Sequence, residues 1–333
     1  MDSQSLKSQF DIEWEQPVKI GRYNGVYSQG VLYIMVPIQN WEETELVELY
    51  KMSNHLYAHG DQTVARFKQA RNGSFIGKYQ EEPYVVLYNE HLRVFNTSKM
   101  GRKLAKFHHR GRLFEERVEH ISRIGQWKEL WEKRLDQMEK VYHGKVFSQP
   151  DDEFDLEFIH SFPYFMALAE NAIQYLVDTE LDDDPTDVDA GTVCYRKFSI
   201  SNWGGEVFIK NPFDWTFDHA GRDLSEWTRE HYWNQRRTYE TGVHQFFQEY
   251  QSINVLSSFS WRLTYARLIF PLHYFECIED YYLANSEHNR KLQEEKLQAI
   301  LRGTQDYELF LARFYELAEA PVRTLKIPSL GWV

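Results

Sequence analysis

The stretch from Thr192 to Asp223 constrains the fold and chemistry of this chain more than any other part of its sequence. It carries two side chains of the kind that bind Mg²⁺, the amide of Asn202 and the carboxylate of Asp214. Lys197 stands five positions before Asn202, and no Asp or Glu occurs between Thr192 and Asn202. The segment therefore keeps polar groups that could hold a metal but lacks a carboxylate that could deprotonate a hydroxyl.

Composition disfavours several classes of partner. The chain of 333 residues has a formal net charge of −12, whereas binding to nucleic-acid phosphates needs a cationic face. The longest apolar run, Val31 to Ile38, is far shorter than the ~20 residues of a membrane helix. The polar N-terminus lacks the features of a signal peptide, and the two cysteines have no CxxC spacing. We expect a protein made in the cytoplasm, with no nucleic-acid partner and no membrane insertion.

Residue patterns divide the chain into a β-rich part and a larger helical part. Residues 1–90 alternate as strands, with a hairpin turn predicted at Asn24-Gly25. One helix follows Asn40 and Glu43, which have capping-box spacing, and Gly60 is predicted to end it.

Residues 91–333 show mostly helical periodicity, with a β-hairpin predicted at about 192–214 around a turn at 204–205. Pro163 is predicted to lie near a helix start or at a kink, and Pro271 to kink or divide another helix. The order predicts an α+β fold: a small antiparallel β lobe with one helix, residues 1–90, and a larger mainly helical lobe, residues 91–333. This is the two-lobe arrangement of protein kinases.

Three motifs strengthen the likeness to kinases. Residues 101–108 follow the pattern G-x-x-L-A-x-x-H, and Phe213-Asp214-Trp215 is similar to a metal-binding I-D-W/F motif. Arg222-Asp223-Leu224 resembles the D-L-A sequence that opens the helix after that metal-binding motif. Together they resemble the aminoglycoside phosphotransferase and choline kinase superfamily. Within it the chain resembles the CotS/YutH family of endospore coat-associated proteins, on the runs PFDWTFDHAGRDLSEWTRE, RLIFPLHYFECIEDYY and ELFLARFYELAEAP.

The resemblance implies a kinase-like fold in a protein that is made in the mother cell and associates with other spore coat proteins. In this superfamily the residue matching Asp223 usually braces the catalytic loop. ATP and Mg²⁺ are the ligands that an active member would use. A fold alone does not imply catalysis.

Three positions depart from the pattern of an active kinase. Lys197 stands where the catalytic Asp belongs, and an ammonium cannot accept the proton of a hydroxyl. Val36 stands where the strand lysine belongs. Lys19 is a candidate for a relocated lysine, although a surface position is favoured, and Glu45 or Glu48 is the candidate helix partner. The glycines at 21, 25 and 30 lack the G-x-G-x-x-G spacing of a phosphate-binding loop.

These departures leave Asn202 and Asp214 with two interpretations. They could hold Mg²⁺ and nucleotide, or Asn202 could cap a turn while Asp214 pairs with a cation, which we favour. Our specific hypothesis is an ion pair between Lys197 and Asp214. The function predicted is accordingly a pseudokinase that acts by protein interaction, without a resident cofactor. The alternative is an ATP-dependent phosphotransferase acting on a small hydroxylated acceptor or a coat protein, with Asp218 as a substitute base.

Histidines and a basic cluster offer weaker candidates. His55 and His59 lie four residues apart, a spacing that suits a transition metal, but no third ligand is near in sequence, so exposed helix histidines are favoured. His108 is predicted to be packed and hydrogen-bonded. One basic cluster could dock an acidic partner or form a solvated helix face. Its members are Lys99, Arg102, Lys103, Lys106, Arg110 and Arg112.

Overall fold

A computed structural model describes residues 3–91, 93–95, 98–148, 150–203 and 205–328, with the backbone alone for 93–95, 201–202 and 205–207. Its internal contacts divide the chain into two units. Unit 1 comprises Met1–Ser122, Gly191–Asp223 and Ser252–Asn254, and unit 2 comprises Arg123–Ala190, Leu224–Gln251 and Val255–Val333. The lobe boundary predicted at residue 90 falls inside unit 1, which also contains the segment that begins at residue 191.

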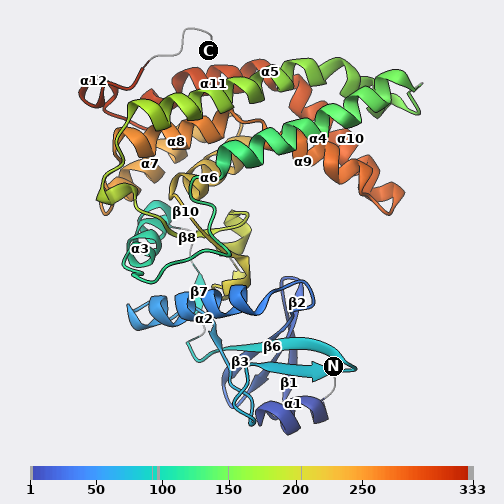
Figure 1. The fold of residues 1–333 in the computed structure, drawn as a ribbon, viewed down its shortest axis with the longest axis vertical. Coiled ribbons are helices and arrows are strands. Elements are labelled where there is room, and N and C mark those ends of the chain that lie inside the picture. Colours follow the sequence, from blue (N-terminus) through green and yellow to red (C-terminus); the bar gives the residue numbers. More distant parts are fainter. Residues whose placement is uncertain (1–2, 92, 96–97, 149, 204, 329–333) are drawn as a thin grey trace. The chain divides into compact units, whose positions relative to one another are not determined.

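Unit 1 contains a six-stranded antiparallel sheet (Figure 1). Its strand order is β1-β2-β3-β6-β4, and β5 pairs with β6. The strands are β1 (Gln16–Ile20), β2 (Tyr23–Ser28), β3 (Val31–Pro37), β4 (Arg66–Phe67), β5 (Ile76–Tyr79) and β6 (Glu82–Asn89). The helices of this unit are α1 (Ser3–Phe10), α2 (Glu43–Ala58) and α3 (Met100–Arg112).

Strand β3 lies in the middle of the strand order, and residues on both of its faces are buried. Alternating side chains point to opposite faces of a sheet. Met35 joins a core that includes Leu6 and Phe10 of α1. Val36 points to the other face, where it lies opposite Val85, a residue that lines a hollow beside α2. The apolar run of β3 thus fills the space between two helical layers.

The first hairpin turns three residues earlier than the sequence suggested. Ile20 pairs with Tyr23, so the turn consists of Gly21 and Arg22 rather than Asn24-Gly25. Gly21 has a φ of +55°, a left-handed conformation that favours glycine. Gly25 lies inside β2, where a Cβ atom would sit only 2.8 Å from the carbonyl oxygen of Tyr33. Its glycine is therefore explained by the close approach of β3, not by a turn.

Helix α2 confirms the helix predicted after residue 40, with a shifted start. The capping box is formed by Glu42 and Glu45, two residues later than the predicted pair Asn40 and Glu43. Glu42 has the extended backbone that an N-cap requires, and each glutamate accepts a hydrogen bond from the backbone of the other. Gly60, with a φ of +85°, follows the helix end as predicted.

The segment after residue 191 forms strands, but they do not pair as one hairpin. Strand β8 (Thr192–Tyr195) pairs with β10 (Trp215–Asp218), and β9 (Gly205–Phe208) pairs with β7 (Arg93–Phe95). Two short 3-10 helices, η2 (Ile200–Trp203) and η3 (Pro212–Asp214), connect them. The two predicted strands are thus present, and each takes a partner from outside the predicted hairpin. Residue 204 of the predicted turn lies outside the described residues.

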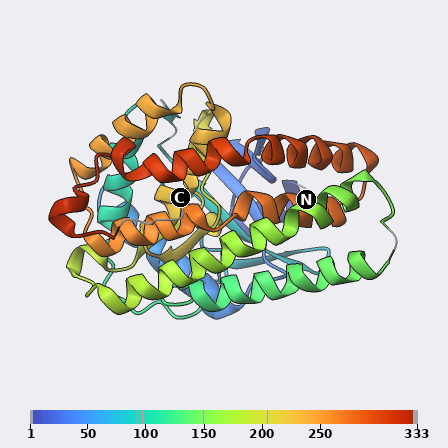
Figure 2. The ribbon, with the colours of Figure 1, turned by 90° about the horizontal axis from the view of Figure 1, so that it is seen from above.

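Unit 2 is helical. The helices of this unit are α4 (Trp127–Phe147), α5 (Glu153–Asp182), α7 (Tyr239–Gln251), α8 (Ser258–Ile269), α9 (Leu272–Tyr282), α10 (Glu287–Arg302), α11 (Thr304–Leu317), α12 (Val322–Leu325) and the 3-10 helix η1 (Asp187–Asp189), together with most of α6 (Gly221–Asn234). Helix α5 packs along α4 and α8, as Figure 2 shows from above.

Two prolines in unit 2 behave differently. Pro271 separates α8 from α9, as predicted. Pro163 lies well inside α5 on an exposed position, where water can satisfy the carbonyl that its missing N–H leaves unpaired. Among the described residues, no helix combines the length and apolar character needed to cross a bilayer. The small antiparallel sheet with its helices and the larger helical part confirm the predicted α+β class.

Candidate functional site

Unit 1 contains the residues that the sequence identified as a candidate site. Lys197 follows β8 and is exposed. Asn202 lies in η2, and its side chain is outside the part of the chain that is described. Asp214 ends η3, and its carbonyl accepts a 2.8 Å hydrogen bond from the backbone N–H of Arg196. The fold therefore brings the backbone beside Lys197 next to Asp214.

Two arginines are the cations that act on Asp214. The Nη2 atom of Arg22 lies 3.8 Å from Oδ1 of Asp214. Arg196 donates from Nε to the carbonyl of Trp215 at 2.9 Å and lies over the ring of Trp41 at 4.4 Å. Burial raises the pKa of the Asp214 carboxyl, and the charges of Arg22 and Arg196 oppose that rise. The β1–β2 turn brings Arg22 to Asp214, and the ion pair hypothesised between Lys197 and Asp214 stays a prediction.

The region expected to hold phosphates is a tight turn. A phosphate-binding loop needs several successive backbone N–H groups pointing at the ligand. Here two residues, Gly21 and Arg22, connect β1 and β2, and the Arg22 side chain donates to the Tyr23 hydroxyl at 2.6 Å. Gly21 is therefore an ordinary hairpin residue, whereas Gly25 lies inside β2.

Val36 stands at the position that the sequence predicts for the kinase lysine, and Glu48 is one of the two candidates for its glutamate partner. Val36, at the lysine position, is 1% exposed within the sheet. Glu48 of α2 accepts hydrogen bonds from the backbone N–H groups of Glu119, His120 and Ile121 at 2.8 to 3.2 Å. The helix glutamate thus binds backbone amides.

Lys19, the candidate for a relocated lysine, has the surface position that the sequence favoured, and Lys51 of α2 has a partner of its own. Lys19 is exposed on β1, opposite Asn24. Lys51 pairs with Glu116 at 2.5 Å.

Two buried aspartates near the segment bind structural partners. Asp218, the candidate substitute base, is 0% exposed and lies 2.5 Å from Nε of Arg222. Asp223 accepts from the backbone N–H of Tyr195 and lies 3.0 Å from Nε2 of His108. Asp223 therefore braces the strand that leads to residues 196–202, and His108 is packed and hydrogen-bonded, both as predicted.

His108, Cys194 and Asp223 also form a group whose ligand atoms lie within 4.8 Å of one another. Among the described residues it is the group of three that meets this criterion. All three side chains are buried, and the Cys194 thiol donates to the carbonyls of Asp218 and His219. Burial raises the pKa of this thiol well above its ordinary value, so the thiolate that a metal requires is disfavoured. We interpret the group as a hydrogen-bonded core.

Sequence reasoning missed a buried ion pair in this unit. Lys210 Nζ lies 2.5 Å from Oδ2 of Asp61, and both side chains are almost fully buried. The same ammonium lies 4.8 Å from the ring centroids of Phe107 and Trp203. Although burial disfavours the charged carboxylate, Lys210 holds the pKa of Asp61 below its usual value. No local signal could have revealed the pair, because 149 positions separate its members.

Solved structures with the same fold are small-molecule kinases. An aminoglycoside phosphotransferase from Alicyclobacillus acidocaldarius superimposes with a TM-score of 0.70 at 15% identity, covering 96% of this chain and 97% of that one. Spectinomycin phosphotransferase APH(9)-Ia, solved with ADP and spectinomycin, gives a TM-score of 0.55 at 15% identity, covering 96% of each chain. The fold is therefore that of the aminoglycoside phosphotransferase-like kinases.

Sequence comparison then gives the family. A model described as "Spore coat putative kinase YutH" matches residues 3–314. The endospore coat-associated protein YutH of Bacillus subtilis (strain 168) is 41% identical over 301 residues, covering 90% of this chain and 88% of that protein. The chain belongs to the YutH family of spore coat proteins, which confirms the resemblance drawn from the sequence.

Proposed function

We propose that this protein is a pseudokinase of the endospore coat, which uses a kinase fold for protein interaction rather than for phosphoryl transfer. The family and the name of the Bacillus subtilis relative support the coat as its place of action, with other coat proteins as its partners. The observation that carries the loss of catalysis is the state of Asp218. This candidate base is enclosed and bound to Arg222, while the position of the catalytic Asp is occupied by Lys197.

Electrostatics around Asp214 supports the same proposal. A metal-binding carboxylate works best when it meets the cation without competition from protein charges. Arg22 and Arg196 already act on Asp214, and Lys197 adds another cation beside Arg196 in sequence. Two cationic side chains that act on one carboxylate disfavour the approach of Mg²⁺, because each adds a repulsive interaction.

Nucleotide binding tests this proposal directly. We expect the melting temperature of the purified protein to stay unchanged on titration with ATP and Mg²⁺ to millimolar concentration, and radiolabelled ATP to yield no phosphorylated product. A ligand present at 100 times its dissociation constant would stabilise the fold by about 2.7 kcal/mol, which is easily seen as a shift in melting temperature. The Asp214→Ala variant serves as the matched control and should give the same flat titration.

The alternative is an ATP-dependent phosphotransferase for a small hydroxylated acceptor or a coat protein. Retention of Asp214, with 37% of its side chain exposed, is the observation that favours it. A thermal shift with ATP and Mg²⁺ that disappears in Asp214→Ala, accompanied by phosphoryl transfer, would replace the pseudokinase proposal with this one.

A further inference from the structure

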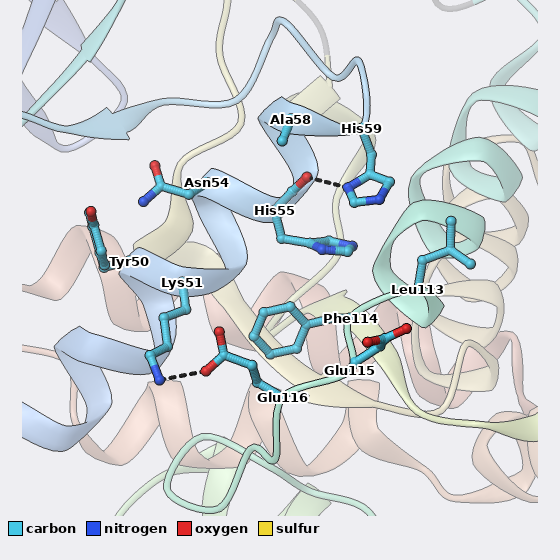
Figure 3. A pocket seen from close by; sticks show the side chains of 10 residues that line it. All are labelled: Tyr50, Lys51, Asn54, His55, Ala58, His59, Leu113, Phe114, Glu115 and Glu116. Carbon is cyan, nitrogen blue, oxygen red and sulfur yellow. Dashed lines mark hydrogen bonds and ion pairs between the residues drawn. The ribbon is translucent and has the colours of Figure 1, made fainter.

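A hollow in the surface of unit 1 brings His55 and His59 together with residues far away in the sequence. The hollow, about 650 Å³ in volume, lies between α2 and the segment that follows α3 (Figure 3). Its walls include both histidines, Phe114, Glu115 and Glu116. Sequence spacing alone offered no third metal ligand for the histidine pair, whereas the fold supplies a carboxylate from residues 115 and 116.

Hydrogen bonds define the tautomer of each imidazole. His55 Nε2 lies 2.8 Å from the carbonyl oxygen of Arg110, and His59 Nδ1 lies 2.8 Å from the carbonyl oxygen of His55. A carbonyl can only accept, so both of these ring nitrogens carry the proton. The remaining nitrogens, Nδ1 of His55 and Nε2 of His59, then hold lone pairs.

This arrangement is the one that metal-binding histidines require. A ligating imidazole usually donates its other N–H to a backbone carbonyl or a carboxylate, which orients the ring and increases its basicity. The two rings also lie close together, with centroids 4.0 Å apart. Their spacing of four residues on one helix keeps them on the same face.

Glu115 is the carboxylate that fits as third ligand. It lines the same hollow as both imidazoles. The three donor atoms do not lie within 4.8 Å of one another in this structure, so the exposed Glu115 side chain must rotate toward the imidazoles to bind a metal ion with them. Glu116 is engaged with Lys51 of α2 across the hollow, as the dashed line in Figure 3 shows.

The cations around the hollow have partners of their own. Lys51 pairs with Glu116, and the guanidinium of Arg110 lies 3.4 Å from Asp61. Only the backbone carbonyl of Arg110 is used by His55. The positive side chains are thus held by other carboxylates, which leaves Glu115 available for a metal ion.

We propose that His55 Nδ1, His59 Nε2 and the Glu115 carboxylate form a binding site for Zn²⁺, with water completing the coordination. Two imidazole nitrogens and one carboxylate oxygen are a donor set that Zn²⁺ accepts in tetrahedral geometry. Mg²⁺ and Ca²⁺ prefer sites made of oxygen alone, so they should not compete. The site is independent of the residues around Asp214.

Calorimetric titration of the tag-free, full-length protein with ZnCl₂ tests the site. We expect one Zn²⁺ per chain, no heat with MgCl₂, and weaker binding at pH 5.5 than at pH 7.5, because the imidazoles must be deprotonated to bind. His59→Ala and Glu115→Gln should each weaken binding about tenfold or more, since loss of a mere supporting group already costs that much.

Matched controls separate the site from non-specific binding. His143 is an exposed helix histidine 3.4 Å from Glu139, without a second imidazole, so His143→Ala should bind Zn²⁺ like the wild type. His55→Ala tests the second imidazole, with circular dichroism to monitor folding, because His55 also packs on Phe114. Wild-type affinity in both His59→Ala and Glu115→Gln, or equal loss in His143→Ala, would overturn the proposal.

Discussion

Lys210 is a single side chain on which the packing of unit 1 depends. Its ammonium is buried between two aromatic rings and contacts Asp61, while Arg110 reaches the same carboxylate from 3.4 Å. Burying a charge is costly unless a partner of opposite sign and hydrogen bonds accompany it. Substitution of either Lys210 or Asp61 alone should therefore lower the stability of unit 1.

Removal of Asp61 tests this view. We expect Asp61→Asn to lower the free energy of unfolding by about 3–5 kcal/mol, because it leaves the ammonium of Lys210 buried without a counter-charge. Urea denaturation followed by tryptophan fluorescence measures the loss. The exposed pair Lys7–Glu13 provides the control, and Glu13→Gln should cost about 1 kcal/mol or less.

A double variant separates the ion pair from other effects of the Asp61 substitution. In Asp61→Asn/Lys210→Met the buried charge is absent, so stability should be higher than in Asp61→Asn alone. Equal losses in the single and double variants would show that the ion pair does not account for the effect.

Helix α2 is the element that departs most from its role in an active kinase. Its Glu48 is 9% exposed and accepts three backbone N–H groups from residues 119–121, which fixes the chain after α3 against the helix. Strand β3 has no lysine with which Glu48 could pair, because Val36 stands at the predicted position. The Glu48 carboxylate therefore holds this loop through its backbone amides.

Substitution of Glu48 should loosen this loop. We expect Glu48→Gln to cost about 3 kcal/mol of stability, because a carboxylate that satisfies several buried donors is replaced by an amide that cannot accept them all. Hydrogen exchange of the amides of residues 119–121 should speed up at the same time. Glu43→Gln, an exposed change on the same helix, should cost no more than about 1 kcal/mol. Unchanged exchange at all three amides would contradict this assignment.

At the scale of the whole molecule, the chain has the fold of the kinases, and we propose that it has lost their catalytic groups. The likeness to kinase structures spans 96% of the chain, while Lys197 and Val36 stand where the sequence predicts the base and the lysine of an active kinase. A fold can persist without its chemistry because packing of the core, and not the active site, determines its stability. In a kinase fold without catalysis, natural selection can still act on the interactions of the protein surface with partners.

Coat association should therefore not depend on the nucleotide site. We expect a fluorescent fusion of this chain, produced in sporulating Bacillus subtilis, to locate to the coat equally well as wild type and as Asp214→Ala. Substitution of the buried Trp215 by Ala, which disrupts the core of unit 1, is the negative control. Loss of coat signal in a stably folded Asp214→Ala protein would favour the phosphotransferase alternative.

Much of the architecture could be predicted from local patterns. Helical periodicity predicted the mainly helical character of residues 91–333, Pro271 marked the break between α8 and α9, and Gly60 marked the end of α2. These features depend on residues a few positions apart, and the spacing of such residues determines their local geometry. Two errors were also local: the first hairpin and the capping box were each placed a few residues from their true positions, because several glycines and polar residues offered equivalent signals. The hairpin predicted at 192–214 was wrong for another reason, because its two strands pair with β10 and β7.

The sequence by itself determined the family, the kinase-like fold and the absence of an acid at the position of Lys197, since each follows from residue identity and order. Only the tertiary structure decided which groups meet: Arg22 with Asp214, Glu48 with the backbone of residues 119–121, and Glu115 beside His55. The reason is physical. Such contacts join segments tens of residues or more apart, so they depend on how the sheet and helices pack, which no short window of sequence contains.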